Sequence, residues 1–386
     1  MHAGCRTALR ELSPAAEGPP LAVLTYATVL PVDWLLGTSA ARARVPLVLV
    51  GLGDAHVRSR LFADKYTALL RAALVLAQAW PTTALVLADA WDVVIANSLD
   101  HASAAARLAI DSVRRSERVL LSTECNSWPR CYRELFEADP GLSRCLKRAG
   151  HTCFSNGGLW MGSARTLASA MIPELLGRMG TPLRHVGCTR DYGRPCRIEH
   201  AYDQAVLNRM LLARAELRAA PPPAAISLHT DSRSSVFLSL FTCVGPLTFR
   251  RLGGIGAEYC HVANHTPLER IRVTADGLAY RGPFDDLRGV DEPPRGEMAR
   301  GGAERPLFVH ANGGGEAGRR LSLPVFAPLR QALAQISADE LRTPVLLVSG
   351  GGGGATCNLT RLDELRRRAG SGCKASWVCA AKMGAG

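Results

Sequence analysis

The chain has 386 residues, 47% of them hydrophobic, and this content excludes a globally disordered protein. The formal net charge is +12, but lysine supplies only four of the 46 basic residues, and the arginines are scattered without interleaved aromatic residues. This pattern argues against nucleic-acid binding, and the lack of a continuous apolar run of about 18 residues argues against a membrane span.

The first third of the chain alternates between apolar runs and segments with helical spacing. In chain order, these predict two strands, a helix, a strand, a helix and a strand, at residues 21–30, 45–53, 63–80, 83–89, 100–116 and 116–124. Strands that are apolar throughout and joined by helices are typical of a parallel sheet covered on both faces. In such a sheet, ligands bind beyond the carboxyl ends of the strands.

Further along the chain, longer polar segments interrupt this pattern. Residues 156–176 predict a tight glycine turn, a short strand and a helix that begins near Ser163, and residues 200–217 predict another helix. A polar, Gly/Pro-rich loop at 281–306 precedes a strand within 307–315. The whole pattern predicts an α/β protein.

We expect one large domain over residues 21–325. Residues 1–20 read as a disordered lead without the apolar core of a signal peptide, and residues 326–386 as a tail of uncertain structure. Five consecutive glycines at 350–354 lack the Lys-Ser/Thr of a phosphate-binding loop and read as low complexity.

Twelve cysteines are many for a cytosolic protein. Six of them fall between Cys125 and Cys196, and no pair has the C-x-x-C spacing of a zinc ribbon. Two glycosylation sequons begin at Asn264 and Asn358. These features predict disulfides and a location in the secretory pathway.

Two acids stand at the carboxyl end of the apolar run 83–89. Asp89 closes this run and Asp92 follows three positions later. Burying an unpaired charge is costly, so these acids either lie in an exposed turn or bind something positive. Carboxylates at this spacing can converge on a divalent cation such as Mg²⁺ or Mn²⁺. A helix N-cap with a first-turn acid is the other interpretation.

Three further groups of polar residues lie at the ends of predicted strands or helices, where they could bind a ligand or take part in catalysis. His310 ends a second apolar strand, where it either completes a metal site or is a hydrogen-bonded surface histidine. Asn312 and the glycines after it allow close approach of phosphate oxygens. Asp203 and Gln204 begin a helix, where they either cap it or face the transferred group or an acceptor hydroxyl.

Eight motifs occur in the order in which a known family has them: LTYAT, GLG, DKYTALLRAAL, LADAWDVVIANS, STECNSWP, SNGGLWMGSA, YDQAVLN and VHANG. Residues 21–315 thereby resemble the glycosyltransferase domain of the procollagen-lysine hydroxylase/glycosyltransferase family and related collagen glucosyl- and galactosyltransferases. The resemblance implies a GT-A fold, a Rossmann-like α/β domain with a mostly parallel sheet. It implies Mn²⁺-dependent transfer of glucose or galactose from a UDP-sugar to hydroxylysine or galactosyl-hydroxylysine of a collagen-like protein, in the lumen of the endoplasmic reticulum.

The resemblance also implies a role for individual residues. The implied metal ligands are Asp89, Asp92 and His310. The implied nucleotide-sugar contacts are Tyr26, Thr28, Lys65, Asp89, Trp91, Asn312 and Gly313. The implied residues of sugar transfer and the acceptor side are Asp203, Gln204, Glu124 and Trp128.

The chain departs from the family where an acidic run would precede Asp203, because only Glu199 stands nearby. This leaves the donor sugar and the acceptor open, and it leaves a non-catalytic nucleotide-sugar or glycan-binding module as an alternative. A third reading is the iron site of a 2-oxoglutarate-dependent hydroxylase, built from His229, Asp231 and His310. His310 fits better as a ligand in the site predicted at Asp89 and Asp92.

Overall fold

The protein is described here as a computed structural model. The structure describes residues 3–30, 34–54, 61–124, 154–179, 190–191, 194–195, 203–216, 226–231, 234–239, 271–274, 277–280, 305–310, 329, 331, 333, 337–351 and 354–370. Among the candidate residues, Asn312, Gly313, Trp128 and Glu199 lie outside these ranges, as do the sequon at Asn264 and most of the loop expected at 281–306.

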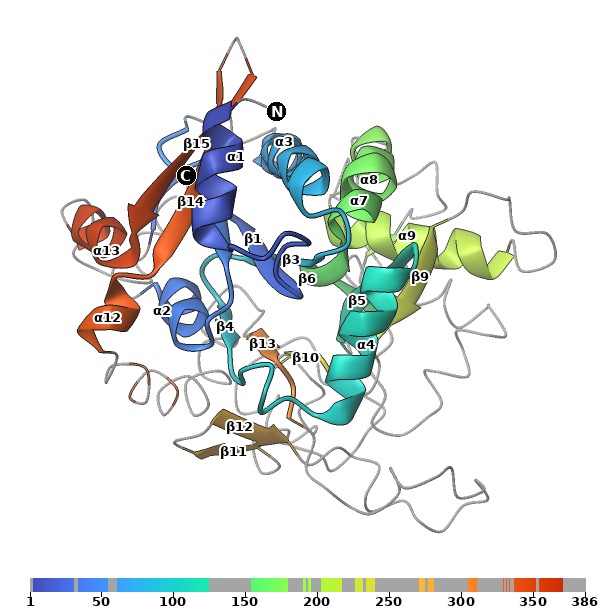
Figure 1. Cartoon of the computed structure of the whole chain (residues 1–386). Helices are drawn as coiled ribbons and strands as arrows, with labels where there is room; N and C mark the ends of the chain where they lie inside the picture. The colour runs from blue at the N-terminus through green and yellow to red at the C-terminus, as the bar shows by residue number, and fades with distance from the viewer. Residues whose placement is uncertain are drawn as a thin grey trace.

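An eight-stranded sheet with the order β15-β14-β2-β1-β3-β6-β5-β9 forms the centre of the molecule (Figure 1). Its strands are β1 (Leu21–Tyr26), β2 (Leu47–Val50), β3 (Ala84–Asp89), β5 (Arg118–Glu124), β6 (Phe154–Ser163), β9 (Ser227–Thr230), β14 (Pro344–Gly351) and β15 (Gly354–Arg361). Six of them share one direction, and only β6 and β15 run antiparallel to their neighbours. The predicted α/β class with a mostly parallel sheet is confirmed.

Helices cover both faces of this sheet. One face carries α1 (Ala3–Leu12), α3 (Leu61–Ala79), α7 (Ala164–Thr166), the π-helix η2 (Leu167–Met171), α8 (Ile172–Arg178) and α9 (Asp203–Glu216). The other face carries α2 (Leu35–Arg42), α4 (Ala104–Arg115) and α13 (Leu362–Gly370), while the short α12 (Ala338–Leu341) precedes β14. Along β1, Ala22 and Leu24 join the first core, and Leu21 and Val23 join the second. Both faces of the strand are buried, which is why its sequence is apolar throughout.

A small sheet continues from the carboxyl end of β3. It has the order β10-β13-β4, with β4 at Val93–Ile95, β10 at Phe237–Ser239 and β13 at Phe308–His310. β4 follows β3 after a short turn, and β13 pairs antiparallel with it so that His310 lies opposite Val93. Two further hairpins pair β11 (Ile271–Thr274) with β12 (Gly277–Tyr280) and β7 (Arg190–Asp191) with β8 (Arg194–Pro195).

The N-terminal segment is not the disordered lead that we expected, because α1 occupies Ala3–Leu12. Cys5 and Leu9 are buried in the core on one face of the sheet, and Cys5 is disulfide-bonded to Cys357 of β15. The surface that stabilises α1 comes from the far end of the chain, so a local pattern could not reveal it.

The expected C-terminal tail contributes two strands of the central sheet. β14 pairs parallel with β2 and antiparallel with β15, and part of the glycine run lies where β14 and β15 meet. The helix expected near Ser163 is confirmed, since the Ser163 hydroxyl accepts the Thr166 N–H as its N-cap. None of the described helices combines the length and the apolarity needed to cross a membrane.

Candidate metal centre and active site

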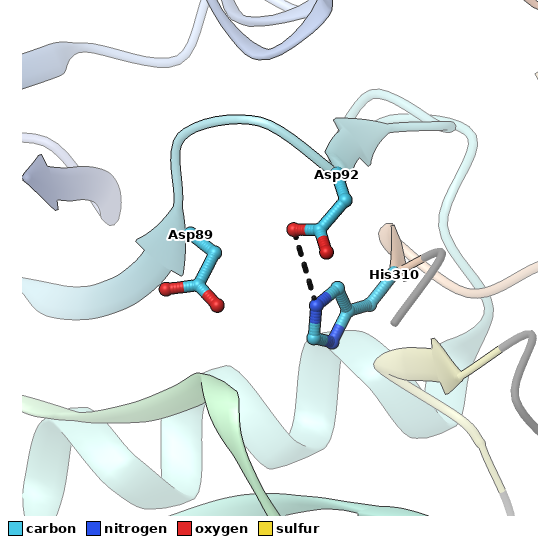
Figure 2. A group of neighbouring side chains, drawn as sticks. All are labelled: Asp89, Asp92 and His310. Carbon is cyan, nitrogen blue, oxygen red and sulfur yellow. Dashed lines mark ion pairs between the residues drawn. The ribbon is translucent and has the colours of Figure 1, made fainter. Parts of the chain in front are cut away.

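Asp89, Asp92 and His310 converge at the carboxyl edge of the central sheet (Figure 2). Asp89 ends β3, Asp92 lies in the turn before β4, and His310 ends β13. One ligand atom from each residue lies within 4.8 Å of the others. The structure therefore brings together the three side chains that the sequence predicted as metal ligands, because the pairing of β13 with β4 places His310 beside the turn.

The ligand atoms of Asp92 and His310 are buried without hydrogen-bond partners among the described residues. They are Asp92 Oδ1 and both ring nitrogens of His310. Asp92 Oδ1 lies 3.3 Å from His310 Nε2, which is an ion-pair distance without hydrogen-bond geometry. Buried polar atoms in proteins are normally paired, so these atoms indicate a ligand. Carboxylate oxygens with an imidazole nitrogen fit a divalent transition-metal ion such as Mn²⁺.

The charged side chains of this site shift the pKa values of one another. Burial works to lower the pKa of His310, but the carboxylates of Asp92, Asp89 and Glu124 raise it. Burial works to raise the pKa of Asp89, but Lys65 and His310 together lower it. The acids of the site are therefore stabilised in their charged form by the positive groups beside them.

A second cluster joins α3 to α9. Lys65 Nζ lies 2.7 Å from Asp89 Oδ1 and 3.6 Å from Asp203 Oδ2. The Tyr66 hydroxyl donates a hydrogen bond of 3.2 Å to Asp203 Oδ2, and the backbone N–H of Gln204 donates to Asp203 Oδ1. Burial works to lower the pKa of Lys65, but Asp89, with smaller contributions from Tyr66 and Asp203, raises it well above its usual value. Lys65 is therefore a permanent cation between two acids.

A third cluster surrounds Glu124, the last residue of β5. Its carboxylate accepts hydrogen bonds from the side-chain amides of Gln204 and of Asn156, the latter at 3.1 Å. Burial raises the pKa of Glu124 to about 7, although both amides work to lower it. The structure thus brings Glu124 together with Gln204 and adds Asn156, while the roles of Glu124 and Gln204 in transfer stay predictions. The sequence signal for Asn156 was its place before two glycines, which we read only as a turn.

Gly157 and Gly158 lie inside β6, so the predicted tight turn at this point is wrong. A Cβ on Gly158 would lie 2.9 Å from His310 Nε2 and still closer to Asp89 Oδ2. A Cβ on Gly157 would lie 2.7 Å from Asp203 Oδ1. Real Cβ atoms do not approach neighbours this closely, so the two glycines let an extended strand pass directly against all three side chains.

The predicted nucleotide contacts that the structure describes lie at or near the same edge. Tyr26 ends β1 opposite Asp89 of β3, and its ring packs against Gly51, which has a φ of +81°. Thr28 follows β1, where its carbonyl accepts the Gly53 N–H, and Trp91 is half-buried in the turn between the two acids. Their contact with a nucleotide remains a prediction.

The iron-site reading of His229 and Asp231 is wrong. The Asp231 carboxylate accepts the backbone N–H groups of Ser235, Val236 and Phe237 at 2.9, 2.7 and 2.7 Å. His229 is exposed, with its ring nitrogen 2.8 Å from the Ser227 hydroxyl. His310 groups instead with Asp89 and Asp92.

No protein-family model matches the chain. No curated protein matches its sequence. Among solved structures, the galactosyltransferase LgtC in complex with donor and acceptor sugar analogues aligns with 83% of this chain and 98% of its own, at 11% identity and a TM-score of 0.31. A likeness of this size carries no argument about function, and the α/β class rests on the strand order and directions of this chain.

Proposed function

We propose that the protein is a metal-dependent glycosyltransferase of the GT-A type, which moves glucose or galactose from a UDP-sugar to a hydroxyl acceptor. The convergence of Asp89, Asp92 and His310, with buried ligand atoms that lack hydrogen-bond partners among the described residues, carries the proposal. It lies at the carboxyl edge of a mostly parallel sheet, where ligands of such folds bind.

The three side chains would hold Mn²⁺ on the donor side of the site. When bound, the ion would offset the charge of the donor diphosphate and stabilise it as a leaving group. Tyr26, Thr28, Lys65 and Trp91 would position the nucleotide-sugar, together with Asn312 and Gly313 from the family resemblance. The protein otherwise supplies positioning, which is a large part of catalysis in group transfer.

The acceptor side would be formed by Asp203, Gln204 and Glu124. Asp203 is our first candidate for the base that takes the proton of the acceptor hydroxyl, because it is buried close to Asp89, one of the three proposed metal ligands. Glu124, with a pKa of about 7, is suited to exchanging a proton near neutral pH. We propose hydroxylysine or galactosyl-hydroxylysine of a collagen-like protein as the acceptor, on the family resemblance. The disulfide between Cys5 and Cys357 supports a location in the secretory pathway.

The direct test measures UDP release from UDP-glucose and UDP-galactose, with and without Mn²⁺, and follows product mass with hydroxylysine and galactosyl-hydroxylysine acceptors. We expect Mn²⁺-dependent release that Asp92→Ala abolishes and that the exposed control Asp339→Ala keeps. Equal activity of Asp92→Ala and wild type would contradict the assignment of Asp92 as a metal ligand.

The altered acidic run before Asp203 favours a second candidate, a non-catalytic module that binds a nucleotide-sugar or a glycan. UDP binding without hydrolysis or transfer, with every acceptor tried, would support this candidate over the enzyme.

A further inference from the structure

The Lys65 side chain lies between two acids of the site, Asp89 and Asp203. Lys65 Nζ contacts Oδ1 of Asp89 at 2.7 Å, and Oδ2 of Asp203 lies 3.6 Å away on its other side. The Lys65 and Asp203 side chains are 14% and 8% exposed, so water screens their attraction poorly, whereas the Asp89 side chain is 36% exposed and reaches solvent on its outer side. Lys65 is therefore the cation that both acids share.

The carboxylate of Asp89 faces two ways. Its Oδ1 atom accepts the Lys65 hydrogen bond, whereas its Oδ2 atom lies on the side of Gly158 and His310, toward the predicted metal ligands. A single negative charge thus serves an ammonium group on one side and the candidate cation site on the other. Two cations that share one carboxylate repel each other, so each weakens the binding of the other.

Among the residues that the structure describes, the remaining neighbours of Lys65 supply no second full negative charge on the Asp89 side. Tyr66 places its ring centroid 5.3 Å from Lys65 Nζ and directs its hydroxyl to Asp203. The position of the ammonium group between Asp89 and Asp203 is therefore set by how much negative charge each acid presents to it.

We propose that Lys65 is an internal counter-ion that competes with the metal ion for the charge of Asp89 and couples metal occupancy to Asp203. Lys65 is in this sense a positioning residue, and the inference rests on the proposed metal site. When a cation neutralises Asp89, the attraction of Lys65 toward Asp203 prevails. The coupling is reciprocal, so a change at Asp203 alters the metal affinity.

Titration of Mn²⁺ into the nucleotide-free protein, by calorimetry or by electron paramagnetic resonance of the free ion, tests this without any activity measurement. We expect Lys65→Met to bind Mn²⁺ more tightly, by about tenfold, because it removes the competing charge. Lys65→Arg keeps that charge and should bind as wild type does. A residue that only contacts the nucleotide would leave the affinity unchanged, and a residue that only supports the fold would lower it on substitution.

Asp203→Asn provides the second arm. Within the described part of the chain it leaves Asp89 as the one acid paired with Lys65, so we expect weaker Mn²⁺ binding by roughly three- to tenfold. In the Lys65→Met background the same substitution should have little effect, because the coupling acts through the ammonium group. A double-mutant cycle over these four proteins measures the coupling directly.

The outcomes separate this inference from the proposed function. Wild-type protein that does not bind Mn²⁺, or whose binding survives Asp92→Ala, overturns the metal site itself. Binding that requires Asp92 but is no tighter in Lys65→Met overturns the counter-ion role alone. Circular dichroism monitors folding, and if Lys65→Met does not fold, Lys65→Gln and Asp203→Asn decide. Wild-type affinity in Asp203→Asn then overturns the inference.

Discussion

His310 Nε2 lies 3.3 Å from Asp92 Oδ1, and one pairing of short strands explains this contact. Val93, the residue after Asp92, opposes His310 where β4 and β13 pair antiparallel. The candidate metal site therefore depends on the contacts that position β13, β4 and β6. Single substitutions can test these contacts one at a time.

Gly158→Ala should abolish Mn²⁺ binding. The added Cβ would collide with the Asp89 carboxylate and the His310 ring, and both belong to the predicted ligand set. Calorimetric Mn²⁺ titration checks this expectation. Gly177→Ala in α8 is the control, because its Cβ would meet nothing within 4 Å. Mn²⁺ binding by Gly158→Ala at wild-type affinity would contradict the close approach of β6 to the site.

Asn97→Ala should destabilise the protein and weaken the hold on β13. The buried Asn97 amide donates to the carbonyls of Leu278 and Pro306 at 2.8 and 2.6 Å and accepts the Leu278 N–H at 3.2 Å. Leaving these buried groups unpaired costs about 2–4 kcal/mol. Urea unfolding measures this cost, and the exposed Asn358→Ala on β15 is the control. Equal unfolding midpoints for the two variants would refute the role of Asn97.

Glu124→Gln should change the pH dependence of stability. The pKa of Glu124 rises from an ordinary value of 4.5 to about 7 on folding, so the folded state binds more protons between these values. The contribution of Glu124 is therefore fully present below pH 4.5 and is lost as the pH rises through 7. The loss is of the order of 3 kcal/mol.

Unfolding free energies of wild type and Glu124→Gln between pH 4 and 8 measure this loss. The wild-type curve should fall relative to that of the variant as the pH increases. Parallel curves would show that the Glu124 carboxyl does not titrate near neutral pH.

Removing the disulfide should destabilise the protein without changing the candidate metal site. Cys5 and Cys357 join the N-terminal helix to the strand at one edge of the central sheet. A disulfide that closes so long a loop contributes about 2–5 kcal/mol. Unfolding of Cys5→Ala/Cys357→Ala should occur at lower denaturant while Mn²⁺ affinity is kept. Mass spectrometry of the unreduced protein should find the linked peptides, and their absence would contradict the bond.

Local sequence patterns were sufficient to predict most strands and helices near the site. The apolar run at 83–89 predicted β3, and helical spacing at 63–80 predicted α3, because burial on one or both faces leaves a local periodic signature. The same patterns placed Asp89 and His310 at strand ends. The grouping of Asp89, Asp92 and His310 could be expected because these residues lie at or just beyond such strand ends, while their binding of a metal ion stays a prediction.

Contacts between distant segments decided the rest, and no local pattern encodes them. The sequence did not reveal that β6 passes through the site on two glycines, that Asn156 holds Glu124, or that α1 and the β14–β15 hairpin complete the fold. The sequence determined which chemical groups the protein carries at its strand ends. Only the tertiary structure placed Lys65 between Asp89 and Asp203, because that position follows from packing α3 over β1 and against α7 and α8.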